Sequence, residues 1–437
     1  MLRVERICCL RRQKVGARLS TIHIKGPARL SGEISIQGSK NAVLPMMAAA
    51  ILHKGITVLT NVPMIQDVDC MVSILNYIGC RCNRKGSTVE IDGTEIECAQ
   101  IPDHFVSQMR SSIIVLGALL GRVGEGESRY PGGCLIGARP IDIHLQVLEC
   151  LGARILEEDG QITARAPAGG LVGAEIRLRY PSVGATEQAL LAGVLARGMT
   201  IVYGAAREPE IGQLCDCLNR MGARVRGAGT GILVIEGVEE LRDSRFAVRG
   251  DRIVAGTYLS AVMAAGGKAW LKEVRPGELE LPLNLMQQAG AVIRRDEVQE
   301  EIFISMNQRP GGLLLETGPY PAFPTDLQSP FMAFLAAGDG ESRIREQVFE
   351  GRFATAEELK RMGGRIYTEG REAVIQGIYP LIAGRVMARD LRGGAALAVA
   401  ALAAEGETVI EDCRHVERGY EDLCRDLRAL GAQAYWG

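Results

Sequence analysis

The chain has 437 residues, and its charges nearly cancel, with 50 Lys and Arg against 52 Asp and Glu and a formal net charge of −2. Together with only 5% aromatic residues, this balance excludes the basic, base-stacking surface of a general nucleic-acid binder and the basic excess of a protein that binds anionic membranes. Because hydrophobic residues make up 47%, the composition indicates a folded protein, and the length predicts more than one domain of about 150 residues.

The N-terminal segment 1–20 is basic but has neither a sustained apolar stretch nor a small-residue cleavage site, so we predict no signal peptide there. We expect these residues to form an extension without a fixed structure, and a functional basic arm is the alternative. The longest apolar run, residues 111–121, is shorter than the about 20 residues of a membrane-spanning helix.

The 12 cysteines are scattered along the chain, and no two of them have the Cys-x-x-Cys spacing of a metal or redox motif. This pattern is typical of a reduced cytoplasmic protein in which most thiols are buried. We therefore expect no metal site.

One pattern occurs six times along the chain: the end of an amphipathic helix, then Gly, then a short β-like run. Each of these glycines stands where a helix stops and a left-handed residue is needed. They are spaced by 68 to 73 residues and are Gly79, Gly152, Gly222, Gly290, Gly363 and Gly431.

A second pattern runs out of phase with the first, in which a small-residue apolar helix ends at Gly and an extended run follows. Its glycines are Gly55, Gly126, Gly198, Gly267, Gly340 and Gly406. Each unit of the repeat therefore contains two helices, each followed by an extended segment. Since the helices over 42–52 and 395–404 have almost no polar face, we predict that they are buried.

The period of the repeat is longer than the about 20 to 50 residues of most solenoids. Six such α/β units are compatible with an open solenoid, one closed array or two domains of three units. For two domains, the join that we favour is Gly250-Asp251, after the third unit.

Lys40, in Ser39-Lys40-Asn41, lies between a short strand predicted over Glu33–Gln37 and an apolar helix. A lysine at such a junction can bind an anion together with the helix N-terminal amides. The alternative is a solvated lysine beside an Asn cap. The sequence lacks the GxxxxGK[ST] motif, which excludes a nucleotide-hydrolysing P-loop.

Cys134 lies in the stretch 130–142, YPGGCLIGARPID, with three glycines around it and Arg139 five residues further on. A thiol in an open, electropositive loop can have a lowered pKa and act as acid, base or nucleophile. The alternative is an inert, buried cysteine in a turn.

Asp326 ends the stretch 321–326, PAFPTD, where two prolines make a rigid, extended loop. A carboxylate held there can serve as a general base, or it can cap the following helix, as can Thr325. Three isolated arginines follow in loops, namely Arg352, Arg392 and Arg418. A lone arginine is usually a solvated surface residue, but several that converge would bind phosphate or carboxylate.

Taken together, these motifs resemble the UDP-N-acetylglucosamine 1-carboxyvinyltransferases, the enolpyruvyl transferases that open bacterial peptidoglycan synthesis. The resemblance covers residues 21–437 and rests on the Cys134 loop, GSKNAVLP, SVGAT, REPEI, YPAFPTD, DLRGG and ERGYE, in family order. It implies an α/β fold of two similar domains, each with three βαβαββ units around buried helices (an inside-out α/β barrel), and an active site between them. The implied domain 1 is 21–39 plus 249–437, and the implied domain 2 is 40–248.

The resemblance also implies roles for residues of this sequence. Phosphoenolpyruvate would be held by Lys40, Arg139 and Arg418, with Arg352 and Arg392 acting in closure and on the phosphate side. Asn41 and Arg110 would meet substrate near the reacting centre. The nucleotide sugar would be lined by Arg139, Pro140, Ile141, Asp142, Ile143 and His144, by Tyr180, Pro181, Ser182, Val183 and Gly184 at the diphosphate, and by Val348 near the sugar or uracil.

The reaction that the resemblance implies is an addition–elimination between phosphoenolpyruvate and the 3'-hydroxyl of UDP-N-acetylglucosamine. Cys134 is implied to be the general acid, which can also form a covalent adduct with phosphoenolpyruvate, and Asp326 the base near the attacking hydroxyl. Lys40 and Arg418 complete the implied catalytic set. No metal or organic cofactor is implied, and we expect a cytoplasmic monomer. Because the epoxide fosfomycin alkylates this thiol in the family, we also expect sensitivity to it.

Four positions depart from the family pattern. Tyr180 stands where some members have Lys, Val254 where many have Glu, Ala118 where Pro is commoner and Gly121 where Ala is commoner. They leave open a second interpretation, a non-catalytic or specialised paralogue that binds the nucleotide sugar. The related shikimate-pathway enolpyruvyl transferase is a further alternative, although it does not use the PGGC-IGARP loop. The presence of Cys134, Asp326 and Lys40 favours the transferase.

Overall fold

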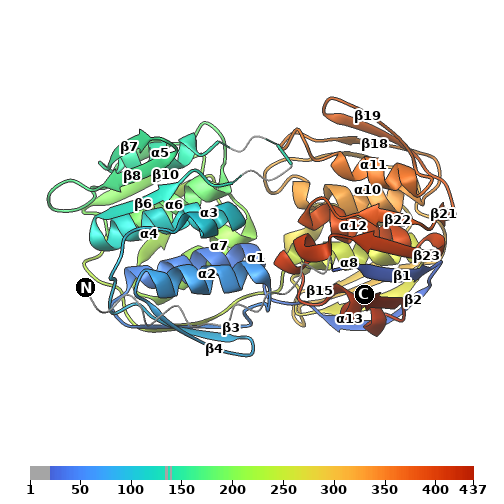
Figure 1. The fold of residues 1–437 in the computed structure, drawn as a ribbon, viewed down its shortest axis with the longest axis horizontal. Coiled ribbons are helices and arrows are strands. Elements are labelled where there is room, and N and C mark those ends of the chain that lie inside the picture. Colours follow the sequence, from blue (N-terminus) through green and yellow to red (C-terminus); the bar gives the residue numbers. More distant parts are fainter. Residues whose placement is uncertain (1–19, 133–135, 138–139) are drawn as a thin grey trace.

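The computed structural model describes residues 20–132, 136–137 and 140–437, and Figure 1 shows that they form two bodies side by side. One hydrophobic core is built from buried residues between 22 and 36 and between 253 and 434, and the other from buried residues between 42 and 248. We call the first body domain 1 and the second domain 2. Residues 1–19, nearly all of the predicted N-terminal extension, lie outside the described residues.

Strands and helices alternate along both domains. Domain 2 contains, in chain order, α1 (Lys40–Ala49), β3 (Ile56–Thr60), α2 (Gln66–Tyr77), β4 (Arg81–Lys85), β5 (Thr88–Asp92), α3 (Asp103–Gln108), α4 (Ile114–Val123), β6 (Glu125–Arg129), α5 (Asp142–Cys150), β7 (Arg154–Glu158), β8 (Gln161–Arg165), β9 (Glu175–Arg177), α6 (Val183–Gly193), β10 (Met199–Tyr203), α7 (Pro209–Arg220), β11 (Arg224–Arg226), β12 (Ile232–Glu236) and β13 (Ser244–Ala247). Domain 1 contains β1 (Ile22–Gly26), β2 (Leu30–Ser35), α8 (Arg252–Ala265), β14 (Gly267–Lys272), α9 (Glu280–Gln288), β15 (Val292–Asp296), β16 (Glu301–Met306), β17 (Leu314–Glu316), α10 (Gln328–Ala336), β18 (Glu341–Arg345), α11 (Ala354–Arg361), β19 (Arg365–Glu369), β20 (Glu372–Gln376), β21 (Leu381–Ile382), β22 (Arg385–Met387), α12 (Leu391–Ala401), β23 (Ala404–Glu411), α13 (Leu423–Ala429) and β24 (Gln433–Trp436).

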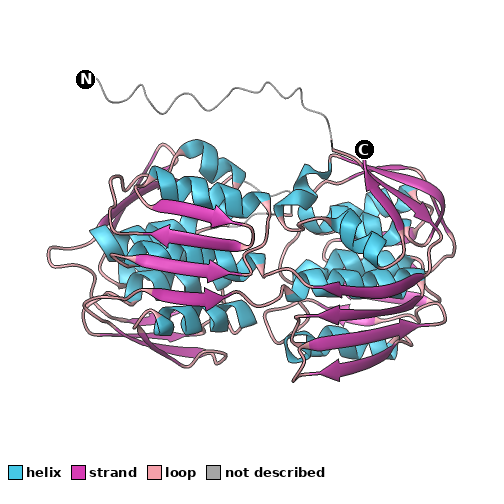
Figure 2. Cartoon of the chain, turned by 90° about the horizontal axis from the view of Figure 1, so that it is seen from below, coloured by secondary structure: helices cyan, strands magenta, loops and turns pink. Residues whose placement is uncertain are grey.

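Six sheets in the described part of the chain share one pattern, three of them in each domain. In the sheet β9-β10-β12-β11, for example, a parallel pair is followed by two antiparallel neighbours, as one βαβαββ unit requires. The sheet β6-β8-β7 has three strands, and a single parallel bridge between Gln100 and Glu127 takes the place of the fourth. Figure 2 shows sheets on the outside of both domains with helices behind them, which agrees with the predicted α/β class.

Three helices pack against one another inside each domain: α1, α4 and α6 in domain 2, and α8, α10 and α12 in domain 1. They are mostly apolar and rich in small residues, and nearly all of their residues are buried, so they are stable only when surrounded by other elements. Every residue of 42–52 and of 395–404 is buried, which confirms the prediction for these two segments. Among the described residues, no helix has the length and the apolar character needed to cross a membrane.

The six glycines of the first repeat pattern all have left-handed backbone, with φ between 82° and 112°, as the sequence predicts. Glycine adopts this conformation without the steric cost that a Cβ would bring. A strand begins two residues after each of them, at β4, β7, β11, β15, β19 and β24. In the second pattern, Gly126, Gly267 and Gly406 do not end helices as predicted but lie within β6, β14 and β23. The preceding helices already end earlier, α4 before the left-handed Gly124, α8 before Gly266 and α12 before Leu402.

Two neighbouring segments carry the chain between the domains, and they pair with each other. Gly38 and Gly250 form an antiparallel bridge, which is supported by a hydrogen bond from Ser39 N to Arg249 O at 2.8 Å. A Cβ on Gly38 or Gly250 would lie 1.8 or 1.9 Å from a backbone oxygen, so neither position has room for a side chain. The strand predicted over Glu33–Gln37 starts and ends earlier, as β2, because the chain then leaves the sheet to cross.

Candidate active site

Asp326 is held between two arginines of its own domain. It lies in the short 3₁₀ turn Thr325–Leu327 before α10, where no described side chain caps the helix. One carboxylate oxygen accepts from Arg352 Nη2, and the other accepts from Nε and Nη2 of Arg392 at 3.3 and 3.2 Å. Both arginine side chains are 3% exposed, whereas that of Asp326 is 29% exposed. Two arginines thus converge on the predicted base, Arg352 from a turn before α11 and Arg392 from the first turn of α12 rather than from the predicted loop.

The charges around Asp326 set its ionisation state. Burial alone would raise the pKa of this carboxyl, but the positive charges of Arg392 and Arg352, with a contribution from Lys40, hold the pKa well below its ordinary value of about 3.9. At neutral pH the carboxylate is therefore ionised, and it can accept a hydrogen bond from a hydroxyl.

A second carboxylate, that of Asp67 in the first turn of α2, is shared by Lys40 and Arg418. Lys40 Nζ lies 2.7 Å from Asp67 Oδ2. Arg418 Nε and Nη2 lie 2.9 and 3.2 Å from the two carboxylate oxygens. Lys40 and Asp67 belong to domain 2, whereas Arg418 belongs to domain 1. This cluster therefore joins the two domains.

Lys40 is the first residue of α1, and its side chain is only 12% exposed, so the solvated-lysine alternative is wrong. Burial lowers the pKa of Lys40, an effect that Asp67 opposes and that nearby arginines reinforce. Asp251 of domain 1 accepts the hydrogen bond of Lys40 N at 3.1 Å. A backbone N–H group at the start of α1 therefore has its hydrogen-bond partner in the other domain. Asn41 follows half-buried within the first turn of α1 and is not its cap.

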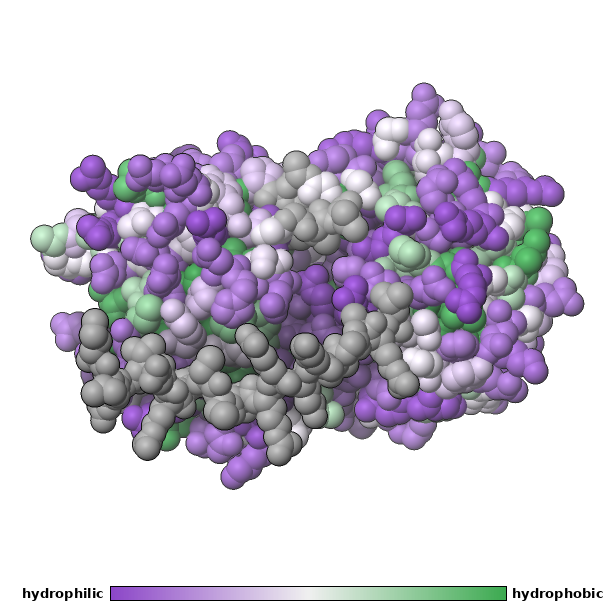
Figure 3. Space-filling view, in the orientation of Figure 1, coloured by the Kyte–Doolittle hydropathy of each residue, from purple (hydrophilic) through white to green (hydrophobic). Residues whose placement is uncertain are grey.

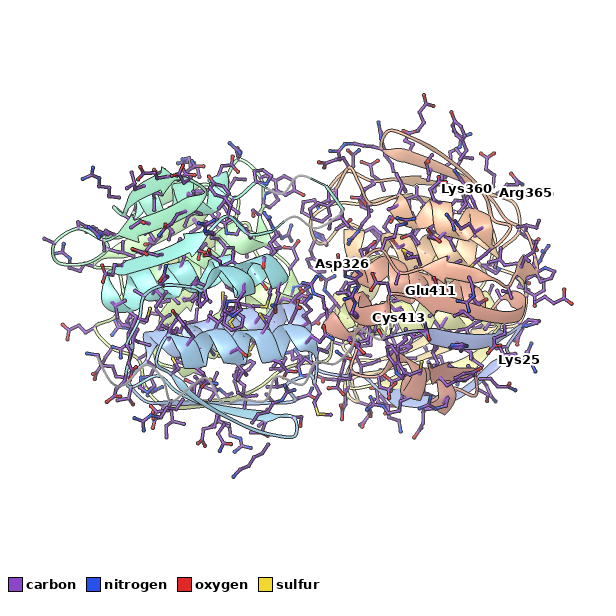
Figure 4. The ribbon with its side chains drawn as sticks, viewed as in Figure 1. Lys25, Asp326, Lys360, Arg365, Glu411 and Cys413 are labelled. Atoms are coloured by element: carbon purple, nitrogen blue, oxygen red, sulfur yellow. The ribbon has the colours of Figure 1, made fainter. Side chains whose placement is uncertain are left out.

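The two carboxylate clusters both lie at the junction of the domains. Lys40 influences the pKa of Asp326, and Arg392 influences that of Lys40, so the charges of the two domains lie within electrostatic reach. Figure 4 shows Asp326 on the side of domain 1 that faces domain 2, and Figure 3 shows a hollowed, hydrophilic region between the domains.

Several buried helices begin at this junction. Lys40 is the first residue of α1, Arg392 is the second residue of α12, and Asp326 lies in the turn that leads into α10. The first turn of a helix has N–H groups without intrahelical partners and carries a partial positive charge. Together with the side-chain cations, these helix starts make the junction suited to anions.

Cys134 and Arg139 lie outside the described residues, so the structure does not place them. A described neighbour of both reaches domain 1, where Ile136 O accepts a hydrogen bond from Gly351 N at 2.9 Å. Ile136, two residues after the predicted general acid in the sequence, therefore contacts domain 1.

The first group of residues predicted to line the nucleotide sugar lies at the start of α5. Pro140 O lies 3.5 Å from Arg110 Nη2, which brings two predicted site residues together from segments 30 positions apart. The carboxylate of Asp142 pairs with Arg179. Of the remaining members, Ile141 is buried, and Ile143 and His144 are half-buried.

The second predicted group lies at the start of α6, next to α5. Ser182 caps this helix, because its Oγ accepts a hydrogen bond from Ala185 N at 3.3 Å. His144 packs directly on Gly184, where a Cβ would lie 2.3 Å from the imidazole. Val183 begins the helix, and the two residues before the cap are Pro181, half-buried, and Tyr180, exposed. The two predicted groups thus form one surface.

Val348 lies in a loop of domain 1 that is organised by the fully buried Glu346. Glu346 Oε1 accepts hydrogen bonds from Val348 N at 2.8 Å and from Phe349 N at 3.0 Å, and Oε2 accepts from Thr325 Oγ1 at 2.9 Å. Since Thr325 directly precedes Asp326, one carboxylate holds both the loop of Val348 and the turn that carries the predicted base.

Known proteins resemble this chain over nearly its whole length. The family model of EPSP synthase (3-phosphoshikimate 1-carboxyvinyltransferase) matches residues 24–427. UDP-N-acetylglucosamine 1-carboxyvinyltransferase 2 of Caldanaerobacter subterraneus subsp. tengcongensis is 44% identical over 410 residues, which are 94% of this chain and 97% of that protein. The UDP-N-acetylglucosamine 1-carboxyvinyltransferase of Cellvibrio japonicus is 46% identical over 411 residues, with the same two coverages. The chain belongs to the UDP-N-acetylglucosamine 1-carboxyvinyltransferase family.

Solved structures have the same fold as this family member. The enolpyruvyl transferase NikO from Streptomyces tendae matches with a TM-score of 0.85 at 25% sequence identity, covering 96% of this chain and 99% of that chain. An EPSP synthase from Acinetobacter baumannii matches with a TM-score of 0.71 at 18% identity, covering 96% and 100%, a likeness that shows the fold alone. The predicted family, its enzymatic nature and the enolpyruvyl transferase fold are confirmed.

Tyr180 and Val254, two of the departures from the family pattern, lie outside the carboxylate clusters. Val254, where many members have Glu, is buried in the core of domain 1, and its backbone N donates to Asp251 Oδ1 at 3.1 Å. Tyr180 is 41% exposed, and burial, with the charges of Glu208 and Glu346, raises its pKa. Neither side chain displaces a member of the Asp326 or Asp67 clusters.

Two buried carboxylates in the site, Asp67 and Glu346, are absent from the residues that the motifs predict. An acidic residue in the first turn of a helix is common, because it interacts favourably with the helix dipole. Nothing in the local sequence therefore marks Asp67. Glu346 follows the last residue of β18 and looks like an ordinary strand-end residue until its three donors are seen together.

Proposed function

We propose that this chain transfers the enolpyruvyl group of phosphoenolpyruvate to the 3'-hydroxyl of UDP-N-acetylglucosamine and releases phosphate. The proposal rests on one observation: four buried or half-buried cations meet two carboxylates at the domain junction. The cations are Lys40, Arg352, Arg392 and Arg418. Two anionic substrates require such a local concentration of fixed positive charge, which the net charge of −2 conceals.

The cations at the junction have two sets of partners, one in the protein and one in the substrate. Arg352 and Arg392 serve the phosphate side of phosphoenolpyruvate, while Lys40 and Arg418, with Arg139, hold its phosphate and carboxylate. In the described structure, Arg352 and Arg392 pair with Asp326, and Lys40 and Arg418 pair with Asp67. A guanidinium carries five N–H donors in a planar fork, so each arginine can bind a substrate oxygen without releasing its carboxylate.

Asp326 accepts the proton of the sugar 3'-hydroxyl. Between two arginines its carboxylate is a weak base, because their charges lower its pKa. When the phosphate of phosphoenolpyruvate binds the same arginines, its negative charge offsets theirs, and the basicity of Asp326 rises. Proton transfer is thereby favoured only when both substrates are in place.

The chemical steps are an addition and an elimination. The hydroxyl oxygen bonds to C2 of phosphoenolpyruvate while C3 gains a proton from the Cys134 thiol. In the elimination, one C3 proton returns to the Cys134 thiolate while the C2–O bond to phosphate breaks. The proton held by Asp326 passes to the leaving phosphate, which leaves the enolpyruvyl ether and inorganic phosphate. The cations and helix starts at the junction stabilise the phosphate throughout.

The proposal is tested by phosphate release from the purified full chain. We expect release from phosphoenolpyruvate that requires UDP-N-acetylglucosamine and does not occur with shikimate 3-phosphate. Release with shikimate 3-phosphate instead would identify the shikimate-pathway enzyme. Calorimetric binding of UDP-N-acetylglucosamine without any release would identify a non-catalytic paralogue. Either result would refute the proposal.

The assignment of Cys134 has its own test. Cys134→Ala is expected to abolish the mass increase that fosfomycin produces and to reduce phosphate release. Cys150→Ala, which changes an exposed cysteine on α5, is the control and keeps both. Fosfomycin labelling that persists in Cys134→Ala would contradict the assignment.

We further propose that the protein works as a monomer in the cytoplasm. Both sides of the junction come from one chain, so one copy suffices to build the site. The nine described cysteines form no disulfide, as is typical of proteins in a reducing compartment.

A further inference from the structure

We propose that Tyr420 is a positioning residue for the reaction: through a chain of buried hydrogen bonds it holds Arg392 in the orientation in which Arg392 meets Asp326. Tyr420 lies in the ERGYE motif, two residues after Arg418. This inference rests on the proposed function, because it concerns the arginine next to the proposed base.

The guanidinium of Arg392 has two different neighbours. Its Nε and Nη2 donate to Asp326 Oδ2 at 3.3 and 3.2 Å, and its Nη1 donates to Tyr420 Oη at 3.3 Å. The guanidinium carbon also lies 5.6 Å from the centre of the Tyr420 ring. Tyr420 is 1% exposed and Arg392 is 3% exposed, so water does not readily replace either contact.

The direction of each hydrogen bond behind Tyr420 is determined by the next partner. Thr257 Oγ1 lies 3.0 Å from Ile253 O, a carbonyl that can only accept, so the Thr257 hydroxyl donates its one proton there. Thr257 must then accept from Tyr420 Oη, which lies 2.8 Å away. The lone pairs of Tyr420 consequently remain available to Arg392, and the chain runs in one direction from Arg392 through Tyr420 and Thr257 to the carbonyl of Ile253.

The guanidinium plane is restrained on two sides, by Tyr420 at Nη1 and by Asp326 at Nε and Nη2. If the acceptor at Nη1 is lost, a buried N–H of a charged group has no partner, and rotation toward another acceptor moves Nε and Nη2 away from Asp326. Loss of a hydrogen bond to a charged group changes an equilibrium by about 10- to 100-fold. We therefore expect that, without this acceptor, a smaller fraction of the protein has Arg392 paired with Asp326.

The chain offers a closely matched control in Tyr258, the residue after Thr257. Tyr258 is also 1% exposed, and its Oη donates to Asp426 Oδ2 at 2.7 Å. This bond lies between α8 and α13 and involves neither Arg392 nor Asp326. Tyr258→Phe and Tyr420→Phe therefore remove the same atom from equally buried tyrosines, but only Tyr420→Phe removes an acceptor from the candidate active site.

The kinetic test compares these two variants with wild-type protein. Tyr420→Phe is expected to lower kcat/KM for phosphoenolpyruvate about tenfold or more, and to move the acid limb of its pH profile to higher pH, because a displaced Arg392 no longer holds the pKa of Asp326 as low. We expect Tyr258→Phe and Tyr420→Phe to lower the melting temperature by similar amounts. The kcat/KM of Tyr258→Phe and the acid limb of its pH profile should stay those of wild type. Thr257→Ser keeps the hydroxyl and is expected to behave like wild type, which separates the hydrogen bond from a general packing defect.

A structural measurement keeps this inference distinct from the proposed function. In crystal structures of Tyr420→Phe and Tyr258→Phe, Arg392 is expected to leave Asp326 only in the former. Retention of both Arg392–Asp326 bonds in Tyr420→Phe, or identical kinetics of the two variants, would overturn the role of Tyr420. Absence of phosphate release by wild-type protein would instead overturn the proposed function, and the crystal structures would still decide whether Tyr420 positions Arg392.

Discussion

The two carboxylate clusters at the junction differ in the number of domains that build them. Asp326, Arg352 and Arg392 all belong to domain 1. Asp67 takes Lys40 from its own domain and Arg418 from the other. The folding of one domain therefore suffices for the first cluster, whereas the second also requires the two domains to stand as they do here.

Because of this difference, we expect the Asp326 cluster to act in the chemical step and the Asp67 cluster in the approach of the two domains. A group that takes a proton at one defined atom works best when a rigid body holds it in place before substrate arrives. A cluster that forms across a junction can instead respond to the approach of the domains, and it couples the binding of an anion to that approach. Changes in the Asp326 cluster should therefore alter rate, and changes in the Asp67 cluster should alter binding and the relative position of the domains.

The largest effect is expected from Asp326→Asn, which breaks the single-domain cluster. The amide keeps the shape of the side chain but cannot serve as the base, so we expect kcat to fall by about 10²- to 10⁴-fold. The radius of gyration from small-angle X-ray scattering should stay unchanged, because no interdomain contact is lost. Asp339→Asn, in an exposed pair with Arg309, is the control. A wild-type kcat in Asp326→Asn would exclude Asp326 as the base.

Arg418→Ala breaks the two-domain cluster. It removes a bidentate, charge-assisted pair and a proposed contact to phosphoenolpyruvate, so kcat/KM for that substrate should fall by about 10- to 100-fold. In contrast to Asp326→Asn, the radius of gyration should increase, because a contact between the domains is lost. Arg414→Ala, in the same turn but in an exposed pair with Asp412, should change neither quantity. An unchanged radius of gyration in Arg418→Ala would show that this cluster does not hold the domains together.

Glu346→Gln sharpens the comparison within domain 1. The amide keeps the volume but loses a charged acceptor of three hydrogen bonds, so the loop of Val348 and the turn of Asp326 should loosen together. We expect kcat/KM for UDP-N-acetylglucosamine to fall about tenfold, with an unchanged radius of gyration. Glu357→Gln, in an exposed pair with Lys360, is the control. Equal kinetics in the two variants would contradict a positioning role for Glu346.

The smallest effect at neutral pH is expected from Lys40→Arg. Since burial lowers the pKa of Lys40, this amine loses its proton below the ordinary lysine pKa of about 10.4, and kcat/KM for phosphoenolpyruvate should fall as the pH rises toward that value. An arginine stays charged, so the variant should lose this alkaline limb. Lys360→Arg, an exposed change, should keep it. The check is kcat/KM measured from about pH 6 to about pH 10, and a limb that persists in Lys40→Arg would belong to another group.

Much of the fold could be predicted from local sequence. The left-handed helix ends, such as Gly79 and Gly431, were predictable because a tight chain reversal depends on one residue and its neighbours. Burial of the Ala-rich helices was predictable because a helix without a polar face must be surrounded. The domain division at 21–39 plus 249–437 and 40–248 stays a prediction, one that the two separate cores support.

The candidate site was less predictable. Lys40 and Asp326 lie in motifs, so the sequence drew attention to them, but solvated and helix-capping alternatives remained until their partners were known. Asp67 could not be found, because its partner Arg418 lies 351 positions away. The ERGYE motif contains Tyr420 but does not indicate its role, which depends on where Arg392 and Thr257 lie in space.

By itself, the sequence of this protein determined where helices end, which helices are buried, the α/β class and the family, since each follows from residues close together in the chain or from a linear order of motifs. Only the tertiary structure decided which charges meet. The energy of a buried ion pair depends on distance and on the exclusion of water, and here both result from the double crossing at Gly38 and Gly250, which brings the starts of helices from two domains to one junction.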